Sequence, residues 1–116
     1  MDKKAFGDHG ERLAGKYLKR KGYKIVAKNY RTPFGEIDIV ARDDASLVFV
    51  EVKTRSNTRH GYPEMNVHPA KLRHFVSAAQ NFISEKGFEC PYRLDVVSID
   101  FSDGKADIRH FENITG

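Results

Sequence analysis

The sequence has little of what several common classes of protein require. Cys90 is the only cysteine among 116 residues, so a disulfide within the chain is impossible and zinc knuckles are excluded. No apolar run approaches the roughly 20 residues of a membrane-spanning helix, and no hydrophobic stretch follows the charged start Met-Asp-Lys-Lys. We therefore expect a protein of a reducing, cytoplasmic setting.

Familiar catalytic patterns are also missing. The five histidines show no spacing typical of a metal-ligand pair, and no Ser-His-Asp, Cys-His or glycine-rich phosphate-binding arrangement is present. Internal repeats and low-complexity segments are absent as well. A length of 116 residues predicts one domain that spans residues 1–116, and 40% hydrophobic residues are enough for a core. The net charge of +4 is compatible with a nucleic-acid partner but does not require one.

The centre of the sequence predicts a β-hairpin. The polar segment 43–46 separates two β-rich runs, 36–42 and 47–55, and consists of residues that are common in turns. We expect an antiparallel pair with a four-residue loop. Because side chains alternate between faces along a strand, one face of each run is almost wholly apolar and includes Ile37. The other face carries the strong charges Glu36, Asp38, Glu51, Lys53 and Arg55.

The register of this hairpin predicts an unusual pair of carboxylates. If Arg42 pairs with Leu47, Asp38 lies opposite Glu51, and Glu36 lies opposite Lys53. Two carboxylates at ~5 Å repel by roughly 3 kcal/mol before screening, at an effective dielectric near 20. A bound Mg²⁺ or Mn²⁺ would reverse the sign, because these ions prefer carboxylate oxygens. The pattern leaves open a solvated polar face with an ordinary Glu36–Lys53 ion pair.

The N-terminal segment 3–21 is predicted to be a helix, with Gly22 as its C-terminal glycine. Glu11 borders the buried side of this helix, so it could reach the carboxylate pair. The segment from Asp8 to Glu11 also has the form of a capping box, in which the glutamate returns to the helix start. Both interpretations stay open. The apolar stripe of the helix consists of Leu13, Ala14, Tyr17 and Leu18.

The remaining elements complete an α-β-β-β-α-β-β order and a mixed sheet with helices packed against it. The sequence predicts strands at 23–30, 92–101 and 106–111, and a helix from His68-Pro69 to about Lys86. The polar segment 55–66 is predicted to be a loop, either a phosphate-backbone contact or a solvated segment. Its candidate contacts are Arg55, Arg59 and His60. On the second helix, Lys71, Arg73 and His74 favour a solvated basic face over a nucleic-acid contact.

Two stretches together resemble a known active-site motif. They are Gly35-Glu-Ile-Asp38 and Val-Phe-Val-Glu51-Val-Lys53-Thr-Arg55, and they resemble the motif of the PD-(D/E)xK, or restriction-endonuclease-like, nuclease superfamily. The chain is more specifically similar to the YraN-like family of small bacterial proteins, themselves similar to archaeal Holliday junction resolvases. Further matching pieces are Gly10-Glu11-Arg-Leu-Ala14, Tyr17-Leu18, Asn29-Tyr30-Arg31 and Arg93-Leu-Asp95-Val-Val97.

The resemblance implies a fold and a site. It implies an α/β fold with a restriction-endonuclease-like α-β-β-β-α-β core and one extra C-terminal strand. It also implies that Asp38 and Glu51 are ligands of Mg²⁺ or Mn²⁺, that Lys53 is the catalytic lysine, and that Glu11 is an additional acid and metal ligand. Ile37 stands where the superfamily motif has proline.

The implied function is a metal-dependent endonuclease acting on DNA, with branched, Holliday-junction-like DNA as the finer expectation. Arg31 and Lys71 join the candidate DNA contacts. Because symmetric junctions suit two-fold enzymes, we also expect a homodimer. The alternatives are a non-catalytic nucleic-acid-binding module that keeps the nuclease fold and a protein–protein scaffold.

Overall fold

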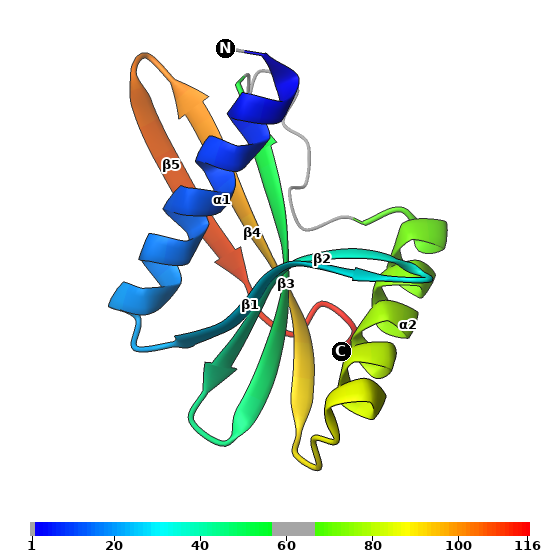
Figure 1. Ribbon diagram of the computed structural model, residues 1–116. Helices are drawn as coiled ribbons and strands as arrows, with labels where there is room; N and C mark the ends of the chain where they lie inside the picture. Colours follow the sequence, from blue (N-terminus) through cyan, green and yellow to red (C-terminus); the bar gives the residue numbers. More distant parts are fainter. Residues whose placement is uncertain (1, 57–66) are drawn as a thin grey trace.

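Five strands form one mixed sheet, and two helices pack against it (Figure 1). In the computed structural model, residues 2–56 and 67–116 are described. The sheet order is β1-β2-β3-β4-β5, in which only the β3–β4 pair is parallel. The elements are α1 (Lys3–Arg20), β1 (Lys24–Thr32), β2 (Gly35–Asp43), β3 (Ser46–Arg55), α2 (Pro69–Lys86), β4 (Tyr92–Ser102) and β5 (Lys105–Phe111). The predicted α-β-β-β-α-β core with one extra C-terminal strand is confirmed.

Helix α1 begins and ends where local signals place it. The Asp2 side chain accepts a hydrogen bond from the backbone N–H of Ala5 at 2.7 Å and so caps the first turn. Gly22, with φ of +94°, follows the last turn. The predicted capping box at Asp8 is wrong, because Asp8 lies inside the helix and forms an ion pair with Lys4. The stripe of α1 packs on Ile39, Ala41, Val48, Val50, Val97 and Ile99 of the sheet.

Helix α2 covers the other face of the hairpin. It begins after the cap His68 and ends before Gly87, which has φ of +71°, as predicted. Its buried side chains Phe75 and Phe82 belong to a second apolar cluster. That cluster includes Val40, Leu47, Phe49 and Leu94 of the sheet. The hairpin face that carries the charges is therefore not the solvated surface of the alternative prediction, because α2 covers much of it.

The turn of the β2–β3 hairpin confirms the predicted register. Arg42 pairs with Leu47, as expected. The loop is shorter than predicted, because Asp43 also pairs with Ser46 and leaves a two-residue turn. Asp44 begins this turn with φ of +56°, a conformation that aspartate tolerates better than most residues.

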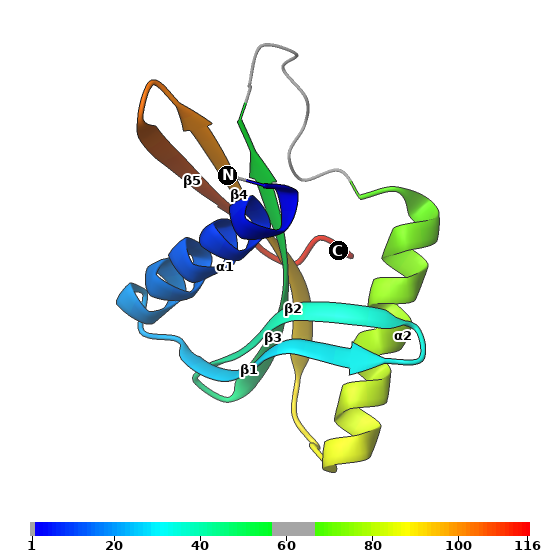
Figure 2. The same ribbon diagram turned by 45° about the horizontal axis from the view of Figure 1, so that its top comes forward.

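The two strands separate beyond the pair formed by Ile39 and Val50. Asp38 and Glu51 therefore do not form the next ladder pair, which corrects the predicted pairing. The backbone N–H of Val52 donates instead to the Oδ2 atom of Asp38 at 2.8 Å. From this point β2 leaves β3 together with β1, and Figure 2 shows the two strands running toward α2.

This separation changes the neighbours of the first residues of β2. Glu36 pairs with Arg31 of β1 and does not lie opposite Lys53, as the continued ladder predicted. Ile37 packs in the cluster under α2, whereas Ile39 packs in the cluster under α1. The prediction that both share one face is wrong, because regular alternation fails where the strand bends. Within residues 2–56 and 67–116, no helix is long and apolar enough to cross a membrane.

Gly10 lets α1 lie close against β3. A Cβ atom added at Gly10 would collide with the side chain of Thr54, including its Cγ2 atom at 2.9 Å. We expect Gly10→Ala to lower the free energy of unfolding by about 1–3 kcal/mol, although alanine favours a helix. Thr54→Ala in the same chain should recover part of that loss. Urea unfolding measures all three proteins.

Gly7→Ala is the matched control on the same helix, because an added Cβ there meets nothing within 4 Å. It should leave the free energy of unfolding equal or higher. Equal losses for Gly7→Ala and Gly10→Ala would contradict close packing at Gly10.

Candidate active site

Three carboxylates from three elements line one cleft. Glu11 comes from α1, Asp38 from β2 and Glu51 from β3, and the cleft has a volume of about 570 Å³. The close contact at Gly10 brings its neighbour Glu11 to this place, and the separation of β2 from β3 opens the space beside Asp38. The structure thus brings together all three acids that the sequence predicted as site residues.

Asp38 is the acid whose ionised form is most strongly disfavoured. Burial, together with the nearby negative charges of Glu51 and Glu11, raises the pKa of Asp38 to about 7. The hydrogen bond from the Val52 N–H and the charge of Lys71 act in the opposite direction but do not outweigh it. The site therefore concentrates negative charge in a place where solvent screens it poorly, and an added cation would be stabilised there.

A lysine of helix α2 lies beside Glu51. The Nζ atom of Lys71, in the first turn of α2, lies 2.6 Å from the Oε2 atom of Glu51. The Glu51 side chain is 12% exposed and that of Lys71 is 59% exposed. Lys71 is thus part of the site and not a residue of a detached basic face.

Glu11 and Glu36 are joined by an amide. In the orientation that satisfies its neighbours, the Asn29 side-chain nitrogen donates to Glu11 Oε1 at 2.8 Å and to Glu36 Oε1 at 3.2 Å. Burial raises the pKa of Glu11, and the charges of Asp8 and Glu36 add to this effect. Arg31 forms an ion pair of 3.6 Å with Glu36, and its side chain is 89% exposed. The acidic group therefore extends from the cleft to the β1–β2 strand pair.

The remaining predicted residues lie farther along β3 or outside the described part of the chain. Lys53 follows Glu51 by two residues, so it shares its side of the strand, and it pairs with Ser98 of β4. Arg55 lines the cleft and forms an ion pair of 3.7 Å with the buried Asp100. The predicted contacts Arg59 and His60 lie outside the described residues.

Asp38 and Glu51 could supply two carboxylate ligands to a divalent ion, although no larger group of metal-ligating side chains among the described residues surrounds them. In residues 2–56 and 67–116, no group of three or more His, Cys, Asp or Glu side chains is arranged to hold a metal. Mg²⁺ usually retains several waters and takes only one or two protein carboxylates together with substrate phosphates. The neighbouring acids Asp38 and Glu51 meet that lower requirement. The role of Glu11 as a third ligand stays a prediction.

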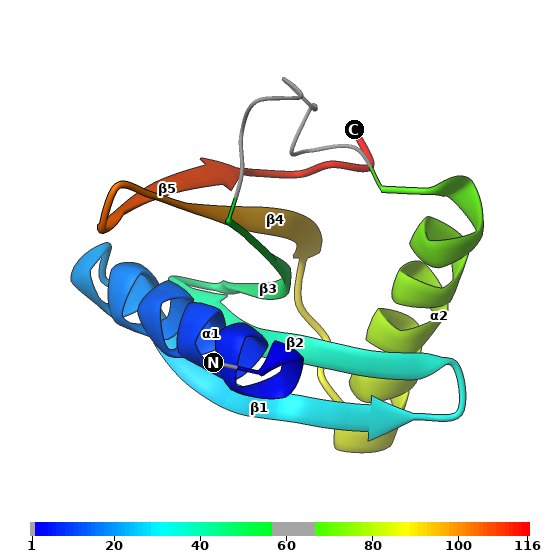
Figure 3. The same cartoon turned by 90° about the horizontal axis from the view of Figure 1, so that it is seen from above.

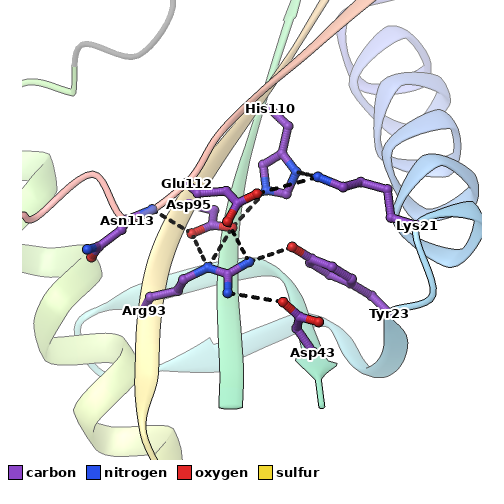
Figure 4. Close-up of polar contacts among 8 residues, drawn as sticks. All are labelled: Lys21, Tyr23, Asp43, Arg93, Asp95, His110, Glu112 and Asn113. Carbon is purple, nitrogen blue, oxygen red and sulfur yellow. Dashed lines mark hydrogen bonds and ion pairs between the residues drawn. The ribbon is translucent and has the colours of Figure 1, made fainter. Parts of the chain in front are cut away.

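A second polar cluster was not predicted as a functional or structural group (Figure 4). The fully buried carboxylate of Asp95 accepts hydrogen bonds from Arg93, from His110 Nε2 at 2.7 Å and from the backbone N–H of Asn113. Burial opposes its ionised form, but these donors outweigh burial and hold the pKa of Asp95 below its ordinary value. Arg93 also donates to Tyr23 and Asp43.

This cluster joins Tyr23, which lies just before β1, to β2, β4, β5 and the C-terminal segment. Lys21, which follows α1, donates to the Nδ1 atom of His110 at 2.9 Å. Because its members satisfy one another, we assign the cluster to holding the strands and not to catalysis. Its sequence signal was the closely spaced charged pair Arg93 and Asp95 at the start of β4.

The raised pKa of Asp38 predicts how stability depends on pH. The folded protein binds a proton at Asp38 up to about pH 7, whereas the unfolded chain loses it near pH 3.8. The free energy of unfolding should therefore fall as the pH rises from about 4 to 7, and the cost is fully present above pH 7. Asp38→Asn keeps a hydrogen-bond acceptor for the Val52 N–H and should gain roughly 1 to 3 kcal/mol at pH 8.

Urea unfolding at pH 5 and pH 8 checks this expectation. Asp107→Asn, at a carboxylate whose side chain is 64% exposed, is the control and should follow the wild type at both pH values. An Asp38→Asn protein that is clearly less stable than the wild type at pH 8 would contradict the proposed electrostatic cost.

The chain is similar to two solved structures at low sequence identity. The first, titled a complex of EndoMS with double-stranded DNA, has a TM-score of 0.47 and 18% identity. The match covers 82% of this chain and 38% of that one. The second is SfsA from Pyrococcus furiosus in complex with Ca²⁺, with a TM-score of 0.42 and 15% identity, over 96% of this chain and 64% of that one.

Sequence similarity to other proteins extends along almost the whole chain. A "UPF0102 protein" of Syntrophomonas wolfei is 47% identical over 105 residues, which are 90% of this chain and 91% of that protein. Another from Syntrophotalea carbinolica is 44% identical over 92% of this chain and 88% of that protein. The model of uncharacterised protein family UPF0102 matches residues 10–99. The predicted family resemblance is confirmed, and the chain belongs to family UPF0102, the YraN-like proteins.

Proposed function

We propose that this protein is a metal-dependent endonuclease that hydrolyses phosphodiester bonds of DNA. The observation that carries the proposal is the group of poorly screened carboxylates in the cleft, with the pKa of Asp38 raised to about 7 and cationic side chains beside it. Perturbed carboxylates in a cleft are a frequent property of catalytic sites. Carboxylates and lysines in one place suit a cation and an anionic phosphate together.

Each residue has a distinct part in this proposal. Asp38 and Glu51 would hold Mg²⁺ or Mn²⁺, which when bound activates water and polarises a phosphate. The Val52 N–H fixes the Asp38 carboxylate through one oxygen, so this ligand is oriented before any metal arrives. Lys53 would orient the nucleophile or offset charge that develops at the phosphate. Glu11 would add a third acid from α1.

The proposal also covers the DNA contacts and the assembly. Arg55 lines the cleft and Arg31 lines a neighbouring pocket that shares Glu11 with it, so both could bind the DNA backbone near a cleaved bond. Branched DNA is the proposed substrate class within DNA, and a homodimer would suit a two-fold junction. A non-catalytic DNA-binding module would share the salt-dependent binding but would not need the metal.

Cleavage assays test the proposal directly. Linear, nicked and four-way DNA are incubated with the protein in Mg²⁺ and in Mn²⁺. We expect metal-dependent cleavage that falls at least about 100-fold in Asp38→Asn, Glu51→Gln and Lys53→Met, because each removes charge at the reacting phosphate. Asp107→Asn on β5 should cleave as the wild type does. If no substrate is cleaved with protein in excess, or if all variants cleave equally, the proposed nuclease activity is refuted.

Lys71 is expected to compete with the metal for Glu51. The Lys71 ammonium group forms an ion pair with the Glu51 carboxylate. Lys71→Met should therefore lower the melting temperature of the metal-free protein. It should also increase the rise in melting temperature that Mn²⁺ causes. Arg73→Met removes the same charge from an exposed position on the same helix and is the control. Thermal melts with and without Mn²⁺ measure both. Equal metal-induced rises in the two variants would contradict competition at Glu51.

A further inference from the structure

The tip of the β1–β2 strand pair and α2 enclose a second pocket beside the candidate active cleft. Figure 3 shows the connection between the two strands reaching toward α2. The pocket has a volume of about 180 Å³, and Glu51 lines both this pocket and the cleft, so the two spaces adjoin. Its lining includes Phe34, Glu36, Glu51, Lys71, His74 and Phe75.

Phe34 is an exposed aromatic side chain held in place by its turn. It is 46% exposed and is one of three exposed large apolar side chains among the described residues, with Val26 and Tyr92. Its backbone N–H donates to the Oγ1 atom of Thr32 at 3.0 Å, and that hydroxyl donates to the carbonyl of Gly35 at 2.8 Å. Gly35 has φ of +132°, which side chains rarely allow. The turn therefore presents the ring at the pocket instead of letting it fold onto the core.

The side chains that line this pocket favour a flat, uncharged aromatic ligand. Phe34 offers an aromatic face, and Phe75 with Ala78 provides an apolar wall. The two acids Glu36 and Glu51 oppose entry of a phosphate but can accept hydrogen bonds from an amino group. Lys71 and His74 add polar groups from α2. A nucleobase combines these features, because it has an aromatic face and a polar edge.

We propose that this pocket binds one unpaired nucleobase next to the phosphate at the active cleft, with Phe34 stacked on the base. The inference rests on the proposed nuclease function and adds a substrate class to it. A base stacked within continuous duplex cannot enter without unpairing, which costs a few kcal/mol. The pocket therefore favours DNA with an unpaired base near the cleaved bond over unbroken duplex.

The absence of tryptophan allows a direct optical test. The chain has no Trp, so Phe34→Trp places a single indole at the pocket. Tyr92→Trp is the control, because Tyr92 is 40% exposed but does not line the pocket. In EDTA, which prevents metal-dependent cleavage, a single-stranded oligonucleotide should quench the fluorescence of Phe34→Trp saturably and leave that of Tyr92→Trp unchanged. Equal quenching of both, or of neither while the wild type binds, would overturn the inference.

Binding measurements separate this inference from the proposed function. Phe34→Ala should raise the Kd for gapped or branched DNA by about 5- to 150-fold, which corresponds to the loss of one base stack, and change the Kd for duplex less than about twofold. Tyr92→Ala should change neither. If Phe34→Ala binds both DNAs as the wild type does, only the nucleobase pocket is refuted. If the wild type binds no DNA, the proposed function fails, and the pocket proposal with it.

Discussion

The hydrogen bond from the Val52 N–H to the Asp38 carboxylate is the interaction on which the site depends. Where β2 leaves β3, a backbone donor of β3 would lose its partner, and an unpaired buried donor is costly. The Asp38 side chain takes the place of the missing strand. β2 can then leave the sheet, which opens the cleft beside Glu51 and carries the strand connection toward α2. One side chain thus both completes the sheet and supplies an acid to the cleft.

The same arrangement has an electrostatic cost that the rest of the fold must offset. Asp38 lies near Glu51 and Glu11, with Lys71 as the cation that acts on it. Two apolar clusters, one under each helix, hold the strands in place around this charge. Asp95 shows the opposite shift, because three hydrogen-bond donors stabilise its buried carboxylate and lower its pKa. The structural cluster therefore holds an acid whose ionised form is stabilised, whereas the candidate site holds one whose ionised form is disfavoured.

Local signals in the sequence predicted much of the fold. The helix ends followed from Gly22, His68 and Gly87, and the hairpin register followed from the polar turn after Arg42. The face of Ile37 was wrong because alternation assumes a strand that stays straight. The register places Asn29 opposite Asp38, and its φ of +51° accompanies the bend; asparagine tolerates this conformation, but its identity alone did not predict it.

Contacts between distant segments could not be predicted in the same way. Asp38 and Glu51 were expected together from the hairpin register, and Glu11 joined them through its helix position and the family resemblance. The ion pair of Lys71 with Glu51, by contrast, joins two elements whose approach no local pattern encodes. The Asp95 cluster depends likewise on Tyr23 before β1, on β5 and on the C-terminal segment. Residues 57–66, which include two predicted DNA contacts, are outside the described structure.

We propose that Asp38 and Glu51 together form a site for a divalent cation. Calorimetric titration of the folded wild type, Asp38→Asn and Glu51→Gln with Mn²⁺ at pH 8 tests it without any DNA. We expect saturable binding to the wild type and its loss in both variants, with Asp107→Asn binding as the wild type does. Mn²⁺ binding of unchanged affinity in Asp38→Asn and Glu51→Gln would contradict it.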